Sequence, residues 1–185
     1  MGAVTNRLIE AIKAIENPNR VGFSGGIVKS YWDSNGYAIG WGNRYLSNGA
    51  TVTRTTEITE GEAEILLIDK LNDFAGVVNN AVTVSINQNQ FEALISFVYN
   101  VGTGSFLNST LLKVVNLNPN DFAAISAEFR KWVLVTVNGQ KVTSNTLKVR
   151  REKEIALYTG TAIGGGLLIV VVLIGLYLLK KKRII

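Results

Sequence analysis

The sequence predicts an α+β fold, a small antiparallel sheet followed by several helices, with one further apolar helix at the C-terminus. Three observations support this. Strand-forming residues interrupted by Asn-Gly pairs fill residues 27–52, apolar residues recur at helical spacing over 59–158, and the run 162–179 contains no charge. We therefore expect a globular domain over residues 1–160, a membrane helix over 161–180 and a tail over 181–185.

The C-terminal run begins at Ala162, ends at Leu179 and reads AIGGGLLIVVVLIGLYLL. As a helix it would be about 27 Å long, roughly the thickness of the hydrocarbon core of a bilayer. A buried core helix is the alternative, but this run is apolar on every face and lies at the end of the chain. The sequence therefore predicts a single-pass membrane protein whose lipid partner is contacted by this run.

The positive charge is concentrated behind the run. Four of the nineteen Lys and Arg residues follow it directly, at Lys180, Lys181, Lys182 and Arg183, so the rest of the chain carries 15 positive against 14 negative side chains. Such a nearly neutral domain does not suggest nucleic-acid binding. A basic cluster beside a span contacts anionic lipid or, in a virus particle, the genome.

The chain has no cysteine and no histidine. Disulfides, Cys or His metal sites and any catalytic triad built on His are thereby excluded, and we expect no metal and no cofactor. The N-terminus lacks the basic-then-apolar pattern of a signal peptide. Its spacing predicts an amphipathic helix with Leu8, Ile12 and Ile15 on one face, ending near Asn17-Pro18.

Turn and cap residues divide the rest into elements. Asn35-Gly36 and Asn48-Gly49 predict hairpins within one sheet over 27–52. Thr59 and Glu62 form a capping box that begins a long helix. Further helices are expected over 89–100, 109–116, 119–132 and 147–158, with Pro119 in the first turn of its helix. Residues 133–142, which contain Asn138-Gly139, form either a loop or a short hairpin.

The segment 23–42, FSGGIVKSYWDSNGYAIGWG, resembles the active-site segment of phage-type lysozymes, the endolysins of glycoside hydrolase family 24. In that family a Phe-Glu-Gly turn ends a helix, an Asp in Tyr-x-Asp follows nine residues after the Glu, and Thr-Ile-Gly comes next. Five further motifs resemble the family in the family's own order: ITEGEA at 58–63, NQFEALISFVYNVG at 89–102, STLL at 109–112, EFRKW at 128–132 and RREKE at 150–154. The resemblance covers about residues 23–158 and implies a lysozyme-like fold with a β lobe and a helical lobe.

The resemblance also implies a chemistry, the hydrolysis of the β-1,4 link between N-acetylmuramic acid and N-acetylglucosamine in peptidoglycan. The family's Glu protonates the leaving oxygen, while its Asp and Thr hold the attacking water. Only Asp33 matches this pattern as a catalytic residue. Ser24 occupies the Glu position and Ala38 the Thr position, and a serine hydroxyl cannot deliver a proton near neutral pH.

Other interpretations of these residues remain open. Asp33 also suits the start of a turn. Tyr31, Tyr37 and Trp41, together with Trp32, suit either stacking on sugar rings or packing in the sheet. Glu16 or Glu57 could serve as a displaced acid, although neither stands at the family spacing. Arg150 and Arg151 suit structural ion pairs better than substrate contacts.

Three functions follow as hypotheses. The first is a catalytically inactive, lysozyme-like structural or glycan-binding protein of a membrane-containing virion, with capsid proteins as partners. The second is a membrane-tethered muramidase that acts on peptidoglycan, and the third is a lysis factor that acts on the bilayer. The basic tail places the domain on the opposite side of a virion membrane or bacterial inner membrane, although no signal peptide would carry it across.

Overall fold

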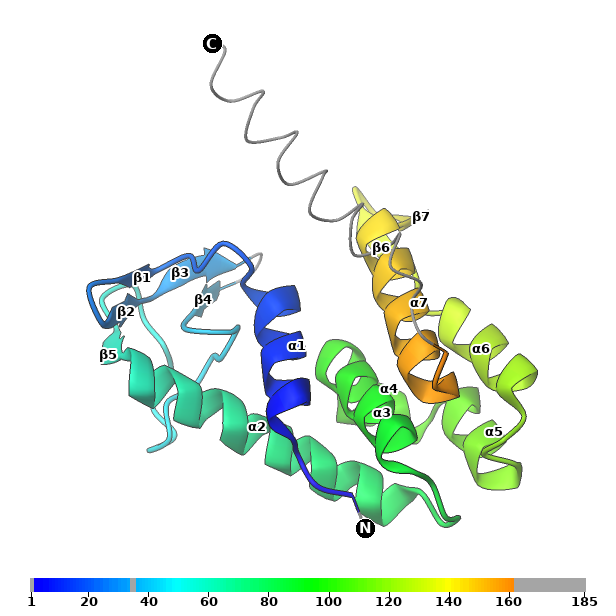
Figure 1. The fold of residues 1–185 in the computed structure, drawn as a ribbon. Coiled ribbons are helices and arrows are strands. Elements are labelled where there is room, and N and C mark those ends of the chain that lie inside the picture. The colour runs from blue at the N-terminus through cyan, green and yellow to red at the C-terminus, as the bar shows by residue number, and fades with distance from the viewer. Residues whose placement is uncertain (1, 34–35, 162–185) are drawn as a thin grey trace.

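The computed structural model describes residues 2–33 and 36–161, which form a β lobe and a helical lobe (Figure 1). The strands are β1 (Phe23–Ser24), β2 (Ile27–Lys29), β3 (Tyr31–Asp33), β4 (Gly36–Ala38), β5 (Glu57–Thr59), β6 (Leu134–Val137) and β7 (Gln140–Thr143). The helices are α1 (Asn6–Glu16), α2 (Glu60–Ala81), α3 (Gln88–Val101), α4 (Thr103–Leu107), α5 (Thr110–Leu117), α6 (Phe122–Arg130) and α7 (Asn145–Thr159). The predicted α+β class is confirmed.

The β lobe contains two small sheets rather than one. Strands β1, β2 and β5 form a three-stranded antiparallel sheet, and β3 pairs with β4 separately, with Asp33 opposite Gly36. The predicted single sheet over 27–52 is wrong in extent, because residues 39–52 form only isolated bridges. Gly40 and Gly42 have φ angles of 61° and 84°, which interrupt an extended backbone.

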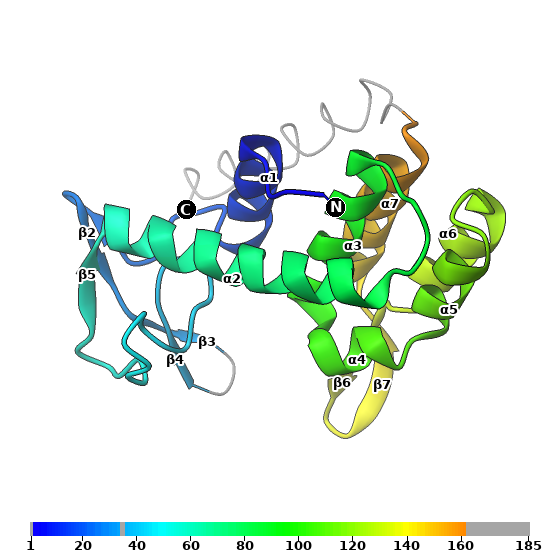
Figure 2. The same cartoon turned by 90° about the horizontal axis from the view of Figure 1, so that it is seen from below.

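Helix α2 connects the two lobes (Figure 2). It begins with the predicted capping box, in which the Thr59 side chain accepts from the backbone N–H of Glu62 and the Glu62 carboxylate accepts from that of Thr59. Helix α1 lies between the lobes and is capped by Thr5 (Figure 1). Its predicted apolar face packs into the core, where Leu8 and Ile12 are 2% and 0% exposed.

Helix α3 is the centre of the helical lobe. The ring of Phe97 lies 5.3 Å, centroid to centroid, from the rings of Phe129 and Trp132, in edge-to-face contacts that join α3 to α6 and to the residues just after it. Helix α6 begins at Phe122, not at Pro119 as predicted, because the Asp121 side chain accepts from Ala124 N and caps the helix there.

Two other predictions concern the C-terminal third. Residues 134–143 form the hairpin β6–β7, with Asn138 and Gly139 both at positive φ, so the hairpin alternative is confirmed. Within residues 2–33 and 36–161, no helix is both long and apolar enough to cross a membrane. The predicted span 162–179 and the basic tail lie outside the described residues, so the membrane helix stays a prediction.

Candidate active site

The residues predicted for catalysis are divided between the two sheets of the β lobe. Ser24 is exposed on β1 and pairs with Ile27 in the three-stranded sheet. Asp33 ends β3 in the other sheet, where its side chain is 48% exposed and Arg44 Nη2 lies 3.2 Å from Asp33 Oδ2. The same Arg44 nitrogen donates to the Asp33 carbonyl at 2.8 Å, so Arg44 contacts both the backbone and the carboxylate of Asp33. Ala38 is fully buried on β4.

The three predicted sugar-binding aromatic residues have different environments. Trp41 is 4% exposed and packs against Phe23 in the core, so for this residue the packing alternative holds. Tyr37 is half-buried and contacts Trp32 edge to face at 5.3 Å between ring centroids. Tyr31 is half-buried, and its hydroxyl donates to the Gly40 carbonyl at 3.3 Å.

A glutamate that the family spacing did not select lies at the junction of the lobes. Glu16 is the last residue of α1, and its side chain is 22% exposed. Arg150 of α7 donates from Nη1 to Glu16 Oε1 at 2.6 Å. This contact joins residues that are 134 positions apart, and it holds the carboxyl group at the end of the helix in one orientation.

Arg150 is held by buried partners of its own. It is 6% exposed, and it donates from Nε to Glu154 Oε1 at 3.1 Å and from Nη2 to the Ser96 carbonyl at 3.0 Å. Burial raises the pKa of the Glu154 carboxyl, while the charges of Arg151 and Arg150 oppose that shift. The predicted role of Arg150 and Arg151 in structural ion pairs is confirmed.

The Tyr31 hydroxyl interacts electrostatically with both Asp33 and Glu16. Burial is the main cause that raises the pKa of the Tyr31 hydroxyl, and the negative charges of Asp33 and Glu16 raise it further. The carboxylates of Asp33 and Glu16 therefore both act on the pKa of the same hydroxyl, that of Tyr31. Glycoside hydrolysis uses two carboxyl groups that flank the scissile bond, so Glu16 and Asp33 are the candidate pair.

Two further side chains, Tyr99 of α3 and Lys70 of α2, interact electrostatically with Glu16. The Tyr99 hydroxyl of α3 donates to the Trp41 carbonyl at 2.6 Å, and burial raises its pKa, with a further contribution from the charge of Glu16. Lys70 of α2 lies with its ammonium 4.5 Å from the centroid of the Tyr99 ring. Burial lowers the pKa of Lys70, and the charge of Glu16 opposes that shift.

The family spacing of nine residues before Asp33 selects Ser24, and Glu16 fits only as a displaced acid. Glu16 precedes Asp33 by 17 residues instead. The available signal was the helix end, since the family's Glu ends a helix and Glu16 ends the predicted N-terminal helix. Ser24, by contrast, belongs to a strand.

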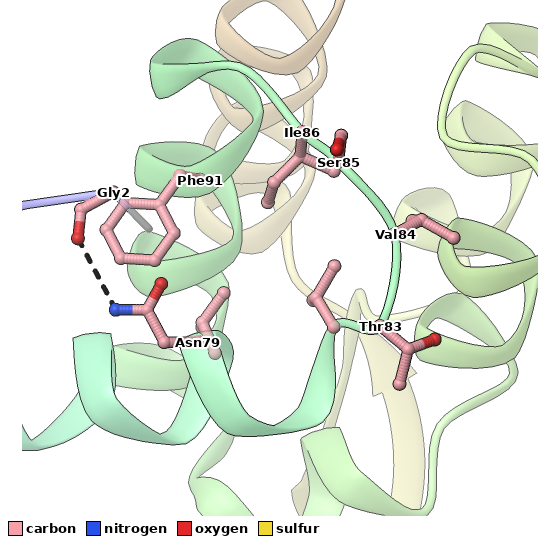
Figure 3. Close-up of a pocket in the computed structure, with 9 residues that line it drawn as sticks. Gly2, Asn79, Thr83, Val84, Ser85, Ile86 and Phe91 are labelled. Carbon is pink, nitrogen blue, oxygen red and sulfur yellow. Dashed lines mark hydrogen bonds between the residues drawn. The ribbon is translucent and has the colours of Figure 1, made fainter.

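A pocket elsewhere offers no comparable chemistry. It has a volume of about 300 Å³ and lies where the N-terminal segment meets the end of α2 and the start of α3 (Figure 3). Asn79 Nδ2 donates to the Gly2 carbonyl there at 3.4 Å, beside the Phe91 ring. No charged side chain lines this pocket.

Comparison with known sequences gives a consistent family. The family model described as phage lysozyme matches residues 22–154. The chain is 35% identical over 122 residues to an endolysin of Acyrthosiphon pisum secondary endosymbiont phage 1, an alignment that covers 66% of this chain and 79% of that protein. It is 38% identical over 125 residues to an endolysin of Bacillus phage PZA, covering 68% of this chain but only 45% of that one. The chain thus spans less than half the length of this Bacillus phage relative.

Solved structures agree with the sequence matches. An endolysin from Escherichia coli O157:H7 phage FAHEc1 superposes with a TM-score of 0.73 at 34% identity, covering 84% of this chain and 92% of that one. The muramidase domain of SpmX from Asticaccaulis excentricus gives a TM-score of 0.67 at 27% identity, covering 85% and 98%. The lysozyme-like arrangement of small antiparallel sheets and a helical lobe is confirmed.

These matches overturn the leading functional expectation. An inactive virion component was inferred from Ser24 and Ala38, yet these matched relatives are named endolysins, and none of the three is named as a structural protein. The expectation is wrong because it rested on one alignment of the acid position, and its capsid and genome partners lose their basis with it. The family model covers most of the chain, and the fold agrees with it over both lobes. The chain belongs to the phage lysozyme family.

Proposed function

We propose that this chain is an active muramidase that hydrolyses the β-1,4 link between N-acetylmuramic acid and N-acetylglucosamine in peptidoglycan, with Glu16 as its general acid. The observation that carries the proposal is the position of Glu16. It ends α1, accepts a hydrogen bond from Arg150 and, like Asp33, acts electrostatically on the Tyr31 hydroxyl. The names of the matched relatives support the same activity.

Glu16 meets the requirements of the acid step. Arg150 donates to Oε1, so we assign the proton transfer to the other oxygen, Oε2. The proton passes from Oε2 to the glycosidic oxygen, and the C–O bond to the leaving sugar breaks. Arg150 also forms an ion pair with Glu154, whose negative charge partly offsets that of the guanidinium. Arg150 can therefore orient the Glu16 carboxyl group without placing a full, unbalanced positive charge beside it.

Asp33 takes the complementary step. Its carboxylate accepts a proton from a water molecule whose oxygen bonds to the anomeric carbon, which completes the hydrolysis. Arg44 fixes the Asp33 backbone and side chain, so the carboxylate has a defined orientation. The buried methyl of Ala38 offers no hydroxyl to help hold the water, so Asp33 carries this task without the family's threonine.

Product analysis tests the proposed reaction directly. The chain is incubated with purified peptidoglycan, the new sugar ends are reduced with borohydride, and the fragments are identified by mass spectrometry. We expect reduced N-acetylmuramic acid at the new ends, because the broken bond lies on the anomeric carbon of that sugar. Reduced N-acetylglucosamine ends, or no fragments at enzyme concentrations where a known muramidase digests the sample, would contradict the proposal.

A further inference from the structure

Trp32 is the most exposed aromatic residue in the part of the chain that the structure describes. It lies on β3 and is 64% exposed, and the next most exposed aromatic residue is Tyr45 at 62%. Burial of an apolar ring favours folding, so most of the indole of Trp32 does not contribute in this way. Tryptophan is also enriched among the residues that dominate the binding energy of interfaces. The ring of Trp32 is therefore a candidate binding surface.

The strand register separates Trp32 from the proposed catalytic carboxylate. Strands β3 and β4 form a two-stranded sheet of their own (Figure 2). Successive side chains of a strand point to opposite faces, so Trp32 and Asp33 do not share a face. Trp32 pairs with Tyr37 across the sheet, whereas Asp33 pairs with Gly36. The rings of Trp32 and Tyr37 thus lie on the face of this sheet opposite the Asp33 carboxylate.

The Trp32 ring is oriented by Tyr37 but not covered. The two ring centroids lie 5.3 Å apart and the ring planes are at 85°, which is an edge-to-face contact. Tyr37 packs in turn against the hydrophobic core, which fixes its position. Because Trp32 remains 64% exposed, a flat face of its indole is open to solvent. The Asp33–Arg44 ion pair belongs to the other face of the sheet, so the open ring suits an uncharged ligand.

We propose that Trp32, braced by Tyr37, is a second glycan-binding site, on which one sugar ring of a peptidoglycan strand stacks outside the cleavage site. In β-1,4-linked N-acetylhexosamines the ring substituents are equatorial, so the axial C–H groups form flat apolar faces. The partly positive hydrogens of such a face are attracted by the negative π face of an indole. The hydroxyl and N-acetyl groups at the edge of the sugar stay in water, which suits an exposed ring rather than a closed pocket.

A second site of this kind has an effect only on a polymer. When one segment of a glycan network is bound at Trp32, the carboxylates of Glu16 and Asp33 meet neighbouring segments at a raised effective concentration. A short soluble substrate that fills the carboxylate site alone gains nothing from Trp32. That peptidoglycan is the polymer rests on the proposed function, whereas the stacking of a sugar ring on Trp32 does not.

Co-sedimentation with purified, insoluble peptidoglycan tests the stacking in the full chain. The Kd is measured at 4 °C, before soluble fragments appear, for the wild type, Trp32→Ala and Trp32→Tyr. Tyr45→Ala is the matched control, since Tyr45 is almost as exposed but lies outside β3 and β4. Hydrolysis is measured in parallel on peptidoglycan and on a soluble tetrasaccharide of alternating N-acetylglucosamine and N-acetylmuramic acid.

We expect Trp32→Ala to raise the Kd at least about tenfold, as truncation of a dominant interface tryptophan does, and Tyr45→Ala to change it less than about twofold. Trp32→Tyr keeps a flat ring and should recover most of the affinity. Hydrolysis of peptidoglycan by Trp32→Ala should fall more than hydrolysis of the tetrasaccharide, because the short substrate needs only the carboxylate site.

An unchanged Kd in Trp32→Ala, or equal rises in Trp32→Ala and Tyr45→Ala, would overturn the proposal. Equal losses of hydrolysis on the two substrates would place Trp32 in the cleavage site and would also overturn it. A wild type that binds peptidoglycan but cleaves neither substrate would contradict the proposed function instead, and the Kd comparison would still decide the stacking.

Discussion

Arg150 Nη1 lies 2.6 Å from Glu16 Oε1, and this contact joins the end of α1, at the junction of the lobes, to α7. The same guanidinium contacts Glu154, which is 2% exposed. A buried arginine that serves two carboxylates is costly to remove, because the carboxylates remain in place without their partner.

Arg150→Ala should therefore lower the free energy of unfolding by about 3–5 kcal/mol, measured by urea denaturation. The control is Arg130→Ala, which breaks the exposed ion pair with Glu152 and should cost about 1 kcal/mol or less. Equal losses in the two variants would show that the Arg150 cluster does not stabilise the fold as its burial indicates.

A second prediction concerns the hydrogen bond by which Tyr99 of the helical lobe contacts the Trp41 carbonyl. Tyr99→Phe removes the hydroxyl that donates to the Trp41 carbonyl at 2.6 Å and leaves that carbonyl without this donor. We expect a loss of about 1–3 kcal/mol in the free energy of unfolding. Tyr45→Phe is the control, since Tyr45 is 62% exposed and its change should stay within about 0.5 kcal/mol. A Tyr99→Phe variant as stable as the wild type would contradict this account of the junction.

Burial of the Lys70 ammonium group should make the free energy of unfolding depend on pH. Burial lowers its pKa in the folded protein, so the folded state binds this proton less tightly than the unfolded chain does. Stability therefore rises with pH between the folded pKa and the ordinary value of 10.5. Lys70→Met removes the charge, so the variant should be more stable than wild type at pH 7, by a margin that shrinks toward pH 10.5.

Urea denaturation at pH 7, 9 and 10.5 measures that margin, with Lys148→Met, at an exposed position on α7, as the control for loss of one lysine. A margin that is the same at all three pH values, or that grows with pH, would show that burial does not disfavour the charge of Lys70.

Ala38 offers a test of the water step. Ala38→Thr supplies the hydroxyl that the family uses at this position, so we expect a higher kcat on peptidoglycan. Because Ala38 is fully buried, the larger side chain should also cost about 1–3 kcal/mol of stability. Activity is compared with Ala50→Thr, an exposed control, after both variants are shown to be folded. An unchanged or lower kcat in folded Ala38→Thr would mean that this position does not face the water.

Local signals made the helical part of the fold predictable. The capping box of Thr59 and Glu62 and the apolar spacing behind it identify α2, and both are properties of neighbouring residues. The two-sheet arrangement was not predictable in the same way, because β5 joins β2 across 27 intervening residues and only the folded chain shows that pairing.

The candidate site was harder to predict for a related reason. The sequence identified Asp33 from a short motif, but the partner of Asp33 depended on the length of the connection between α1 and β2. A fixed spacing assigned the acid position to Ser24, whereas the contact that selects Glu16 comes from Arg150, 134 residues away. Arg150 was expected in an ion pair, but its partner could not be named from the sequence.

The most direct test of the account is the rate of peptidoglycan hydrolysis by Glu16→Gln. Glutamine keeps the size of the side chain and can still accept the hydrogen bond from Arg150, but its amide has no acidic proton to transfer. We therefore expect kcat/KM to fall by about 10²–10⁴-fold. Glu57→Gln, which alters an exposed glutamate on β5, and Ser24→Ala should both keep wild-type rates. A folded Glu16→Gln that hydrolyses peptidoglycan at the wild-type rate, or a Ser24→Ala that loses activity instead, would contradict the assignment of Glu16 as the acid.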